Sequence, residues 1–388
     1  MEIIIHRGTH QIGGCATEVR TGNTRILIDF GAELPDSGGQ TRVDTLKIDG
    51  LNQGKPDFAG VLLTHYHGDH LGLIAQIPEE IPIYMGGEAL EIFSAYSNRV
   101  KSELAGVSGR IRPLDGLVPM TIGDMTVTPI PADHSAYGAF MYLVEGEGNR
   151  VLHTGDFRLH GFRSRATPML LRWYASNVDV LIIEGTQLSR TRHGGLSERE
   201  LQERLKEEIT ENKYVFVLCA STHIDRLASV YNVTPKGRYF VCDKYQYKLL
   251  KRVAAGTDSR WYQFRKMSFY GENLKLRERG FVMPVRTNDF FSRIVSRWPE
   301  AILIYSMWDG YLDGRAPALS EFVRPFEASG RLRRLHSSGH ASSADIRAVC
   351  DQIQPKCGVI PIHTEYGEGL KGISCRVLKL EDREVFAL

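Results

Sequence analysis

One short stretch constrains this chain more than any other feature, the sequence Thr64-His65-Tyr66-His67-Gly68-Asp69-His70. It follows an apolar run at residues 60–63 and precedes another at residues 71–74. In extended backbone the side chains of His65 and His67 point the same way, and Asp69 and His70 at a following turn can face a second position nearby. This spacing can hold two cations. A histidine-rich surface loop is the alternative, but a buried strand directly before so dense a pattern favours a metal centre.

Short apolar runs bounded by glycine and polar residues indicate an α/β architecture. Those at residues 25–28, 60–63 and 179–183 are rich in β-branched residues, and each is followed within two positions by a polar or acidic side chain. Consecutive apolar positions over such lengths favour buried strands. Residues 1–6 are expected to form a first strand; they lack the basic stretch and long apolar core of a signal peptide, which is therefore not expected.

A second segment is expected to begin near Ser197. Ser197 and Glu200 have the spacing of a capping box, with leucines at 196 and 201 as the flanking staple. Later apolar runs separated by helical patterns suit a small α/β unit of its own, and they lie at residues 214–218, 239–241 and 301–305. We expect this unit to end near residue 330.

The last part of the chain is expected to belong to the first domain again. Strands are expected at residues 331–336 and 358–362, around a helix that starts near Ser342. With 388 residues, the chain exceeds the size at which one hydrophobic core usually stops growing. The predicted organisation is therefore a first domain built from residues 1–196 and 331–388, interrupted by a domain of residues 197–330.

Composition excludes some classes of protein. With 42% hydrophobic and 24% charged residues, and no apolar run near the roughly 18 residues of a membrane helix, membrane insertion is not expected. The six cysteines form no CxxC pair, which favours reduced thiols in a cytoplasmic protein. Because the net charge is only +2, nucleic acid would have to bind through local patches.

The HxHxDH pattern resembles the metallo-β-lactamase superfamily, and the other motifs of that family appear in order. Asp29, just after the run at residues 25–28, looks like the first motif. His134 in Ala132-Asp133-His134-Ser135-Ala136 looks like the third, and Asp156 in Thr154-Gly155-Asp156-Phe157-Arg158 looks like the fourth. The resemblance implies an αββα sandwich.

The same resemblance implies a ligand set for two zinc ions, with manganese as an alternative. His65, His67 and His134 would bind one ion, Asp69 and His70 would bind the other, and Asp156 would bridge both. Asp29 would accept a hydrogen bond from a ligand histidine and fix its ring. Taken alone, Asp29 or Asp156 would more often be an ordinary strand-end or turn aspartate.

Three further motifs resemble the β-CASP nucleases, the group that contains RNase J. Glu184 resembles their acidic motif A, His340 in His336-Ser337-Ser338-Gly339-His340-Ala341 resembles motif B, and His363 in Pro361-Ile362-His363-Thr364-Glu365 resembles motif C. The stretch at residues 220–226 resembles the opening of a β-CASP insert. Two departures are Thr364, where the family has glycine, and a chain shorter than RNase J, which leaves oligomerisation open.

The resemblance implies roles for these residues. His363 would complete the shell of the second metal ion, Glu184 would orient a histidine, and His340 would donate a hydrogen bond or a proton. Ser337, Ser338 and Gly339, with His336, would present hydroxyls and amides to a phosphate, although a plain turn is the alternative. Glu184 could instead be a strand-end acid that faces solvent.

The predicted function is metal-dependent cleavage of single-stranded RNA by a metal-activated hydroxide, with Asp69, Asp156, Glu184 and His340 as catalytic residues. Alternatives are a DNA nuclease, a small-molecule esterase, or a noncatalytic RNA-binding scaffold. Trp308 and Tyr311 could stack on bases, unless they belong to the core. Candidate phosphate contacts, which could also be solvated surface charges, are Arg158, Arg163, Arg165, Lys244, Lys248, Lys251 and Arg252.

Overall fold

The computed structural model describes residues 1–35, 46–100, 102–189 and 195–388, and these divide into two compact units. The first unit is formed by residues 1–34 and 46–189 together with Gly339–Leu388. The second unit is formed by Pro35 and Gly195–Ser338. Each unit has its own sheets and its own hydrophobic core.

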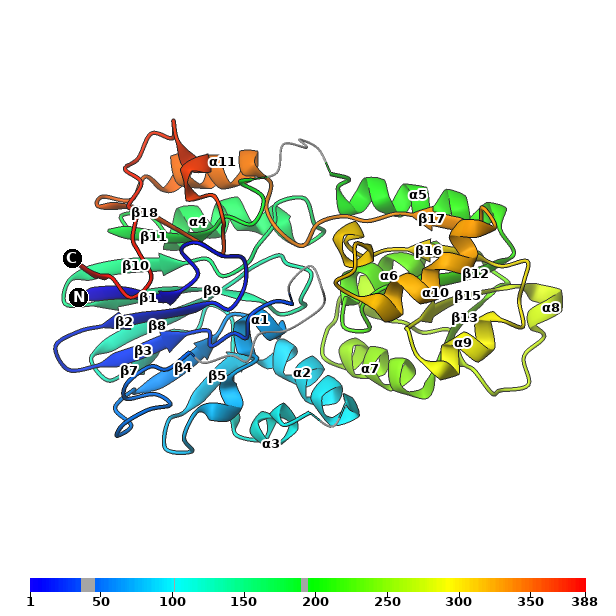
Figure 1. Cartoon of the computed structure of the whole chain (residues 1–388), viewed down its shortest axis with the longest axis horizontal. Coiled ribbons are helices and arrows are strands. Elements are labelled where there is room, and N and C mark those ends of the chain that lie inside the picture. Colours follow the sequence, from blue (N-terminus) through cyan, green and yellow to red (C-terminus); the bar gives the residue numbers. More distant parts are fainter. Residues whose placement is uncertain (36–45, 101, 190–194) are drawn as a thin grey trace. The chain divides into compact units, whose positions relative to one another are not determined.

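The first unit contains two sheets, drawn in Figure 1. One has the strand order β19-β1-β2-β3-β4-β5-β6, with bounds β1 Glu2–Arg7, β2 Ala16–Arg20, β3 Arg25–Ile28, β4 Gly60–Leu63, β5 Ile83–Gly86, β6 Ile111–Leu114 and β19 Val385–Ala387. The other has the order β18-β11-β10-β9-β8-β7, with bounds β7 Met120–Ile122, β8 Met125–Pro131, β9 Phe140–Gly146, β10 Asn149–His153, β11 Val180–Glu184 and β18 Gly358–Ile362.

Helices lie against the outer face of each sheet. Near the first sheet are α1 Gly68–Leu71, α2 Gly87–Val100 and α3 Leu104–Ser108, and α2 contacts β5 and β6. The second sheet is covered by α4 Thr167–Tyr174 and α11 Ser343–Ile353, which lie side by side in Figure 1. The short 3-10 helices of this unit are η1 Ile74–Gln76, η2 Ser164–Ala166 and η5 Gly367–Leu370. The αββα layering expected from the motif series is confirmed.

Alternation along the strands explains these layers. On β10, Val151 belongs to the core between the two sheets, whereas its neighbour Leu152 belongs to the core under α4 and α11. Leu181 and Ile182 on β11 divide in the same way. Because successive strand side chains point to opposite faces, an uninterrupted apolar run is what a strand needs when both its faces are covered.

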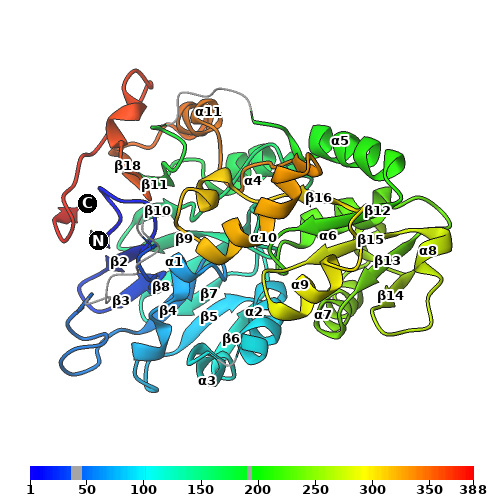
Figure 2. The ribbon, with the colours of Figure 1, turned by 45° about the vertical axis from the view of Figure 1, so that its right-hand side comes forward.

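The second unit is a six-stranded sheet with the order β14-β13-β15-β12-β16-β17, and all its strand pairs are parallel. Its elements are α5 Glu198–Glu211, β12 Tyr214–Leu218, α6 Ile224–Val233, β13 Tyr239–Cys242, α7 Lys244–Ala255, η3 Arg260–Tyr262, β14 Met267–Phe269, α8 Leu276–Arg279, β15 Phe281–Val285, α9 Asp289–Val295, β16 Ile302–Tyr305, η4 Asp309–Leu312, α10 Pro317–Ala328 and β17 Leu332–Arg334. Figure 2 shows α9 and α10 in front of this sheet, where their apolar residues share one core with it.

Local signals at the helix starts are borne out. Ser197 and Glu200 form the capping box of α5, and Leu201 on its inner face is fully buried. Helix α11 begins at Ser343, with Ser342 as its N-cap in a second capping box. Both caps satisfy backbone N–H groups that have no partner inside the helix.

One boundary differs from the expectation. We expected residues 331–336 to open the returning part of the first domain, but β17 within that range pairs in parallel with β16 of the second unit. The return therefore begins at Gly339. A three-residue strand has too little pattern to indicate which sheet it joins, since pairing depends on distant partners.

Two further findings concern the whole of the described chain. None of its helices combines the length and apolar character needed to span a bilayer. All six cysteines are free thiols, and four of them are buried.

Candidate metal centre

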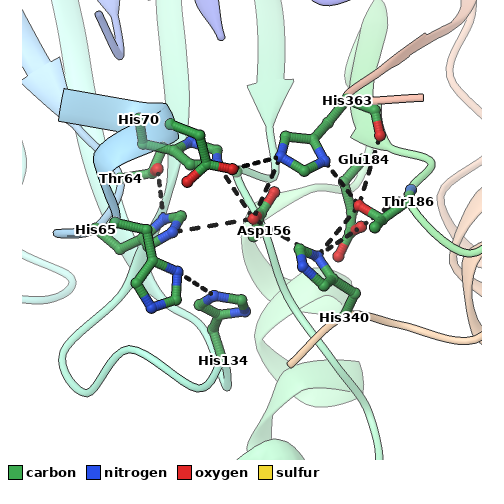
Figure 3. Close-up of polar contacts among 12 residues, drawn as sticks. Thr64, His65, His70, His134, Asp156, Glu184, Thr186, His340 and His363 are labelled. Atoms are coloured by element: carbon green, nitrogen blue, oxygen red, sulfur yellow. Dashed lines mark hydrogen bonds and ion pairs between the residues drawn. The ribbon is translucent and has the colours of Figure 1, made fainter. Parts of the chain in front are cut away.

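The predicted ligands gather at the carboxyl ends of strands in the first unit. Strands β3 and β4 are parallel neighbours, as are β10, β11 and β18, so their following residues meet at common edges of the two sheets. The site residues at or just after strand ends are Asp29 after β3, His65 after β4, His134 after β8, Asp156 after β10, Glu184 on β11 and His363 after β18. Figure 3 shows the side chains of His65, His134, Glu184 and His363 converging around Asp156.

His65, His67 and His134 form a cluster whose ligand atoms lie within 4.8 Å of one another. The Nδ1 atom of His134 is 2.6 Å from the carbonyl oxygen of Gly339, so Nδ1 donates and Nε2 is left as the metal-binding nitrogen. That Nε2 is 3.3 Å from Nδ1 of His67. Burial lowers the pKa of His67 to about 4 and holds the pKa values of His65 and His134 well below the usual range. The three rings are therefore neutral, as ligands must be.

A second group joins Asp69, His70, Asp156 and His363. Nε2 of His363 is 3.2 Å from Oδ2 of Asp69, and Nε2 of His70 is 3.1 Å from Oδ2 of Asp156. The same Asp156 oxygen is 3.8 Å from Nε2 of His363 and 3.9 Å from Nε2 of His65. Asp156 thus lies between the two predicted ligand groups, as a bridging carboxylate would.

The residues present fit divalent cations. Nε2 of His65 and Oδ1 of Asp156 are buried, and neither has a hydrogen-bond partner among the described residues. Buried polar atoms in folded proteins are almost always paired, so two such atoms on adjacent predicted ligands require a partner of another kind. A cation on each side of Asp156 would supply it, with imidazole and carboxylate ligands of the type that zinc accepts.

Asp29 fixes the positions of Thr64 and His70 through hydrogen bonds. Its Oδ1 accepts from the backbone N–H of Thr64 and its Oδ2 from the Thr64 hydroxyl, both at 2.8 Å. Oδ2 is also 2.8 Å from Nδ1 of His70, so the ring presents Nε2 toward Asp156. Asp29 has a φ of +62°, a backbone conformation that few residues other than glycine adopt and that clusters at functional sites.

Glu184 and His340 lie beside Asp156. Glu184 is fully buried, which rules out the solvent-facing alternative, and its Oε2 is 3.2 Å from Nδ1 of His340. Oε1 of Glu184 accepts from the backbone N–H of Phe157 and, at 3.4 Å, from that of Ala341. Glu184 therefore ties the loop that carries Asp156 to the loop that carries His340.

The carboxylates control the charge of the neighbouring rings. Burial alone would lower the pKa of His340, but Glu184 and Asp156 raise it to about 9. Burial likewise opposes ionisation of Asp69 and Asp156, yet the nearby histidines hold both pKa values well below the usual range. In the metal-free protein the His70 pKa is raised well above its ordinary value, against burial, by Asp156 and Asp29. Cation binding at His70 would therefore displace a proton.

The predicted substrate-binding stretch is divided between the two units. His336, Ser337 and Ser338 belong to the second unit, whereas Gly339 belongs to the first, where its carbonyl oxygen accepts from Nδ1 of His134. Trp308 and Tyr311 contact each other edge to face, with ring centroids 5.4 Å apart. The roles proposed for these residues stay predictions.

The assignment of Arg158 as a phosphate contact is wrong. Its side chain is fully buried, and its Nε donates to Oδ1 of Asp133 at 2.8 Å. Arg163 is half-buried and donates to the carbonyl oxygen of His134. Charge counted from sequence cannot distinguish an arginine that holds a loop together from one that faces solvent. The exposed members of the set are Arg165, Lys244, Lys248, Lys251 and Arg252.

Sequence reasoning missed three residues of this region. Thr186 bonds to both His340 and His363, His153 accepts from the backbone N–H of Gly155, and the Cys15 thiol groups with His70 and His363. His153 and Thr186 lie within three residues of Asp156 and Glu184, so proximity in sequence was an available signal. Cys15 offered none.

Comparison with known families gives two matches. A model described as a β-lactamase superfamily domain matches residues 24–217. One described as a Zn-dependent metallo-hydrolase RNA specificity domain matches residues 329–369, which include His340 and His363.

Curated relatives match only part of the chain. Ribonuclease J of Helicobacter pylori is 27% identical over 154 residues, which are 39% of this chain and 22% of that enzyme. The DNA cross-link repair protein SNM1 of Arabidopsis thaliana is 33% identical over 96 residues, 25% of this chain and 18% of that protein. The matches thus cover about a fifth of these relatives' own length.

Among solved structures, a protein of unknown function from Enterococcus faecalis V583 matches all of this chain. The TM-score is 0.78 at 22% sequence identity, and 99% of that chain is covered. This likeness shows the fold.

Proposed function

Because the chain belongs to the β-lactamase superfamily, whose domain model covers half of its residues, we propose that it is a metal-dependent phosphodiesterase that cleaves single-stranded RNA. One observation carries the proposal. Seven ligand-type side chains converge in the first unit, and two of their buried ligand atoms have no other partner among the described residues. They are His65, His67, Asp69, His70, His134, Asp156 and His363.

Divalent cations held by these residues would lower the pKa of water and neutralise charge on a phosphate group. The side chains prepare the place for them: the rings of His65, His67 and His134 are kept neutral by burial, and Asp29 turns His70 toward Asp156. We propose zinc as the resident metal, with manganese as the alternative, since one group consists of imidazoles and the other combines imidazoles with carboxylates.

His340 would act as the proton donor. Its Nδ1 faces the carboxylates of Glu184 and Asp156, so Nε2 is on the opposite edge of the ring, and 24% of the side chain is exposed. In the metal-free protein the carboxylates raise its pKa to about 9, so the ring carries a proton at neutral pH. It could donate this proton from Nε2 to the leaving oxygen of a phosphodiester.

RNA is favoured as the substrate by the RNA specificity model over residues 329–369 and by the similarity to Ribonuclease J. A DNA nuclease is the second candidate, because the chain also resembles SNM1. A noncatalytic RNA-binding scaffold is disfavoured by the complete ligand set, and a small-molecule esterase by the RNA specificity match. We also propose a cytoplasmic location, as none of the thiols is in a disulfide.

The test compares end-labelled RNA and DNA of matched sequence with zinc or manganese supplied, alongside metal analysis of the purified protein. The control is Asp156→Ala, which should lose activity and hold less metal, because two cations would then have less negative charge between them. We expect RNA cleavage and about two metal ions per chain. Hydrolysis of a small ester without cleavage of any polynucleotide would remove the protein from the nucleases, and full activity of Asp156→Ala with both metals bound would refute the bridge.

A further inference from the structure

Thr186 lies two residues after Glu184, at the point where the chain leaves β11, and its side chain is buried. Its Oγ1 is 2.7 Å from Nδ1 of His363 and 3.2 Å from Nδ1 of His340. The hydroxyl also lies 3.5 Å from the carbonyl oxygen of His363, to which it can donate. Figure 3 shows the two rings turned toward Thr186 from different parts of the chain.

These three contacts match the bonding capacity of a hydroxyl group. A threonine hydroxyl has one hydrogen to donate and two lone pairs to accept with. The carbonyl of His363 can only accept, so the hydroxyl hydrogen is directed there. Both lone pairs are then left to accept from the two imidazole Nδ1–H groups.

This arrangement fixes the tautomer of His363. With its proton on Nδ1, Nε2 is unprotonated, and Nε2 is the atom that faces Asp69 at 3.2 Å and Asp156 at 3.8 Å. The N–H of His340 that meets Thr186 also faces Oε2 of Glu184. One hydroxyl thus sets the orientation of a predicted metal ligand and of the predicted proton donor, whose ring centroids are 5.5 Å apart.

We propose that Thr186 is a positioning residue that couples the metal ligand His363 to the proton donor His340. Its hydroxyl holds His363 in the tautomer that binds a cation, and it fixes the orientation of the neighbouring His340 ring. The role of His340 rests on the proposed function, whereas the effect on metal binding does not. A hydrogen-bonded partner behind a ligand histidine is a known determinant of metal affinity.

The decisive comparison is Thr186→Val against Thr186→Ser. Valine keeps the shape and removes the hydroxyl, while serine keeps the hydroxyl and removes the methyl group. Zinc titration by calorimetry should show that the valine variant binds one of its two zinc ions roughly 10- to 100-fold more weakly, and that serine restores most of this loss. Turnover of the valine variant on RNA should fall by about a hundredfold, with a smaller change in KM, since the substrate contacts are intact.

Thr128→Val is the matched control. Thr128 is also buried, but it lies on β8, three strands away from β11, and its substitution should leave zinc binding and turnover unchanged. Wild-type zinc affinity in Thr186→Val would overturn the proposal. So would equal losses in the valine and serine variants, because the methyl group would then be the part that matters.

A measurement on the unaltered protein keeps the proposal testable if the valine variant does not fold. Long-range nitrogen–proton correlation spectra of isotope-labelled histidine report which ring nitrogen carries the proton. His363 should carry it on Nδ1, and a proton on Nε2 in the metal-loaded protein would overturn the proposal. If the wild-type protein cleaves no RNA, the proposed function fails, yet zinc affinities and the tautomer still decide the role of Thr186.

Discussion

His340 differs in charge from the three histidines of the first ligand cluster. It is partly exposed, and its pKa is raised to about 9, whereas burial lowers those of His65, His67 and His134. The three rings that stay neutral are assigned to a metal ion, and His340, which keeps its proton, is assigned to proton donation; the raised pKa of His70 means that a cation bound there would displace a proton. Opposite environments for similar groups separate their roles in this way.

For His340→Ala we expect both metal ions to remain bound while turnover falls by roughly a hundredfold to ten-thousandfold, the usual scale of a lost acid–base group. The measurement is kcat on RNA together with the metal content of the same sample. Loss of a metal ion from this variant would show instead that His340 is a ligand.

His153 predicts a pH dependence of stability. Burial lowers the pKa of this ring to about 4, and its Nδ1 accepts from the backbone N–H of Gly155, so a proton on Nδ1 would face another donor. The folded-state pKa lies below the ordinary value of about 6.5, hence the stabilising contribution is present above pH 6.5 and is lost as pH falls toward 4. The loss is on the order of 3 kcal/mol.

The measurement is the free energy of unfolding of the metal-free protein in urea between pH 4 and 7. His153→Asn keeps an acceptor near Gly155 but cannot be protonated, so its unfolding free energy should fall less steeply with acid than that of the wild type. Parallel curves for the two proteins would show that His153 is not the group responsible.

Single residues were predicted where a motif of several residues carries them. His65, His67, Asp69, His70, His134, Asp156 and His363 were predicted as metal ligands because ligand types recur in a fixed order after apolar strands, and the structure brings them together. Thr186 was missed since one threonine has many ordinary uses, and Arg158 was misassigned because burial is a property of the fold. Contacts between residues far apart in sequence, such as Thr186 with His340, depend on strand order.

Among the elements, the ends of β11 and β18 lie side by side and explain the departure at residue 364. Strands β11 and β18 are parallel neighbours, and Gly185 and Thr364 follow them. A Cβ atom at position 185 would lie 2.8 Å from the Cβ of Thr364 and 2.7 Å from Cδ1 of Leu188. Threonine is accommodated at 364 because its neighbour is glycine.

We therefore expect Gly185→Ala to destabilise the first unit by about 1–3 kcal/mol, because the added methyl group would overpack against Leu188 and Thr364. Combining it with Thr364→Gly should recover much of this loss, because the fixed Cβ is removed and the Leu188 side chain can rotate. Urea unfolding of the wild type, both single variants and the double variant measures the coupling. Purely additive effects would contradict the contact.

Elements with strong local patterns were predicted well. Strands β3, β4, β12 and β18 have the predicted bounds, and the caps of α5 and α11 follow directly from side-chain chemistry. The error at β17 came from the partner of a short strand. The local hydrophobic pattern predicts that a segment is a strand. The sheet that the strand joins depends on contacts with residues distant in the sequence.

At the scale of the whole molecule, two features bear on the polymer that the proposed nuclease would cleave. The chain has a net charge of only +2, so attraction for polyanions must come from local groups such as the exposed Lys244, Lys248, Lys251 and Arg252 on α7. The predicted metal ligands are recessed, since the side chains of His65, His70, Asp156 and His363 are at most 2% exposed. Under the proposed function, a phosphodiester would have to be brought inward to reach them.

We expect single-stranded RNA to be cleaved faster than duplex RNA or duplex DNA, because a flexible strand can bend a phosphate into a recessed site and a stiff duplex cannot. If the four α7 cations each contact a phosphate, raising salt from 50 to 200 mM should weaken binding by up to about 50-fold, and Lys248→Ala should flatten this dependence. Assays of matched single-stranded and duplex substrates test the strand preference. The same assays at both ionic strengths test the salt dependence. An unchanged salt dependence in Lys248→Ala would remove α7 from the binding surface, and equal or faster cleavage of duplex DNA would overturn the RNA assignment.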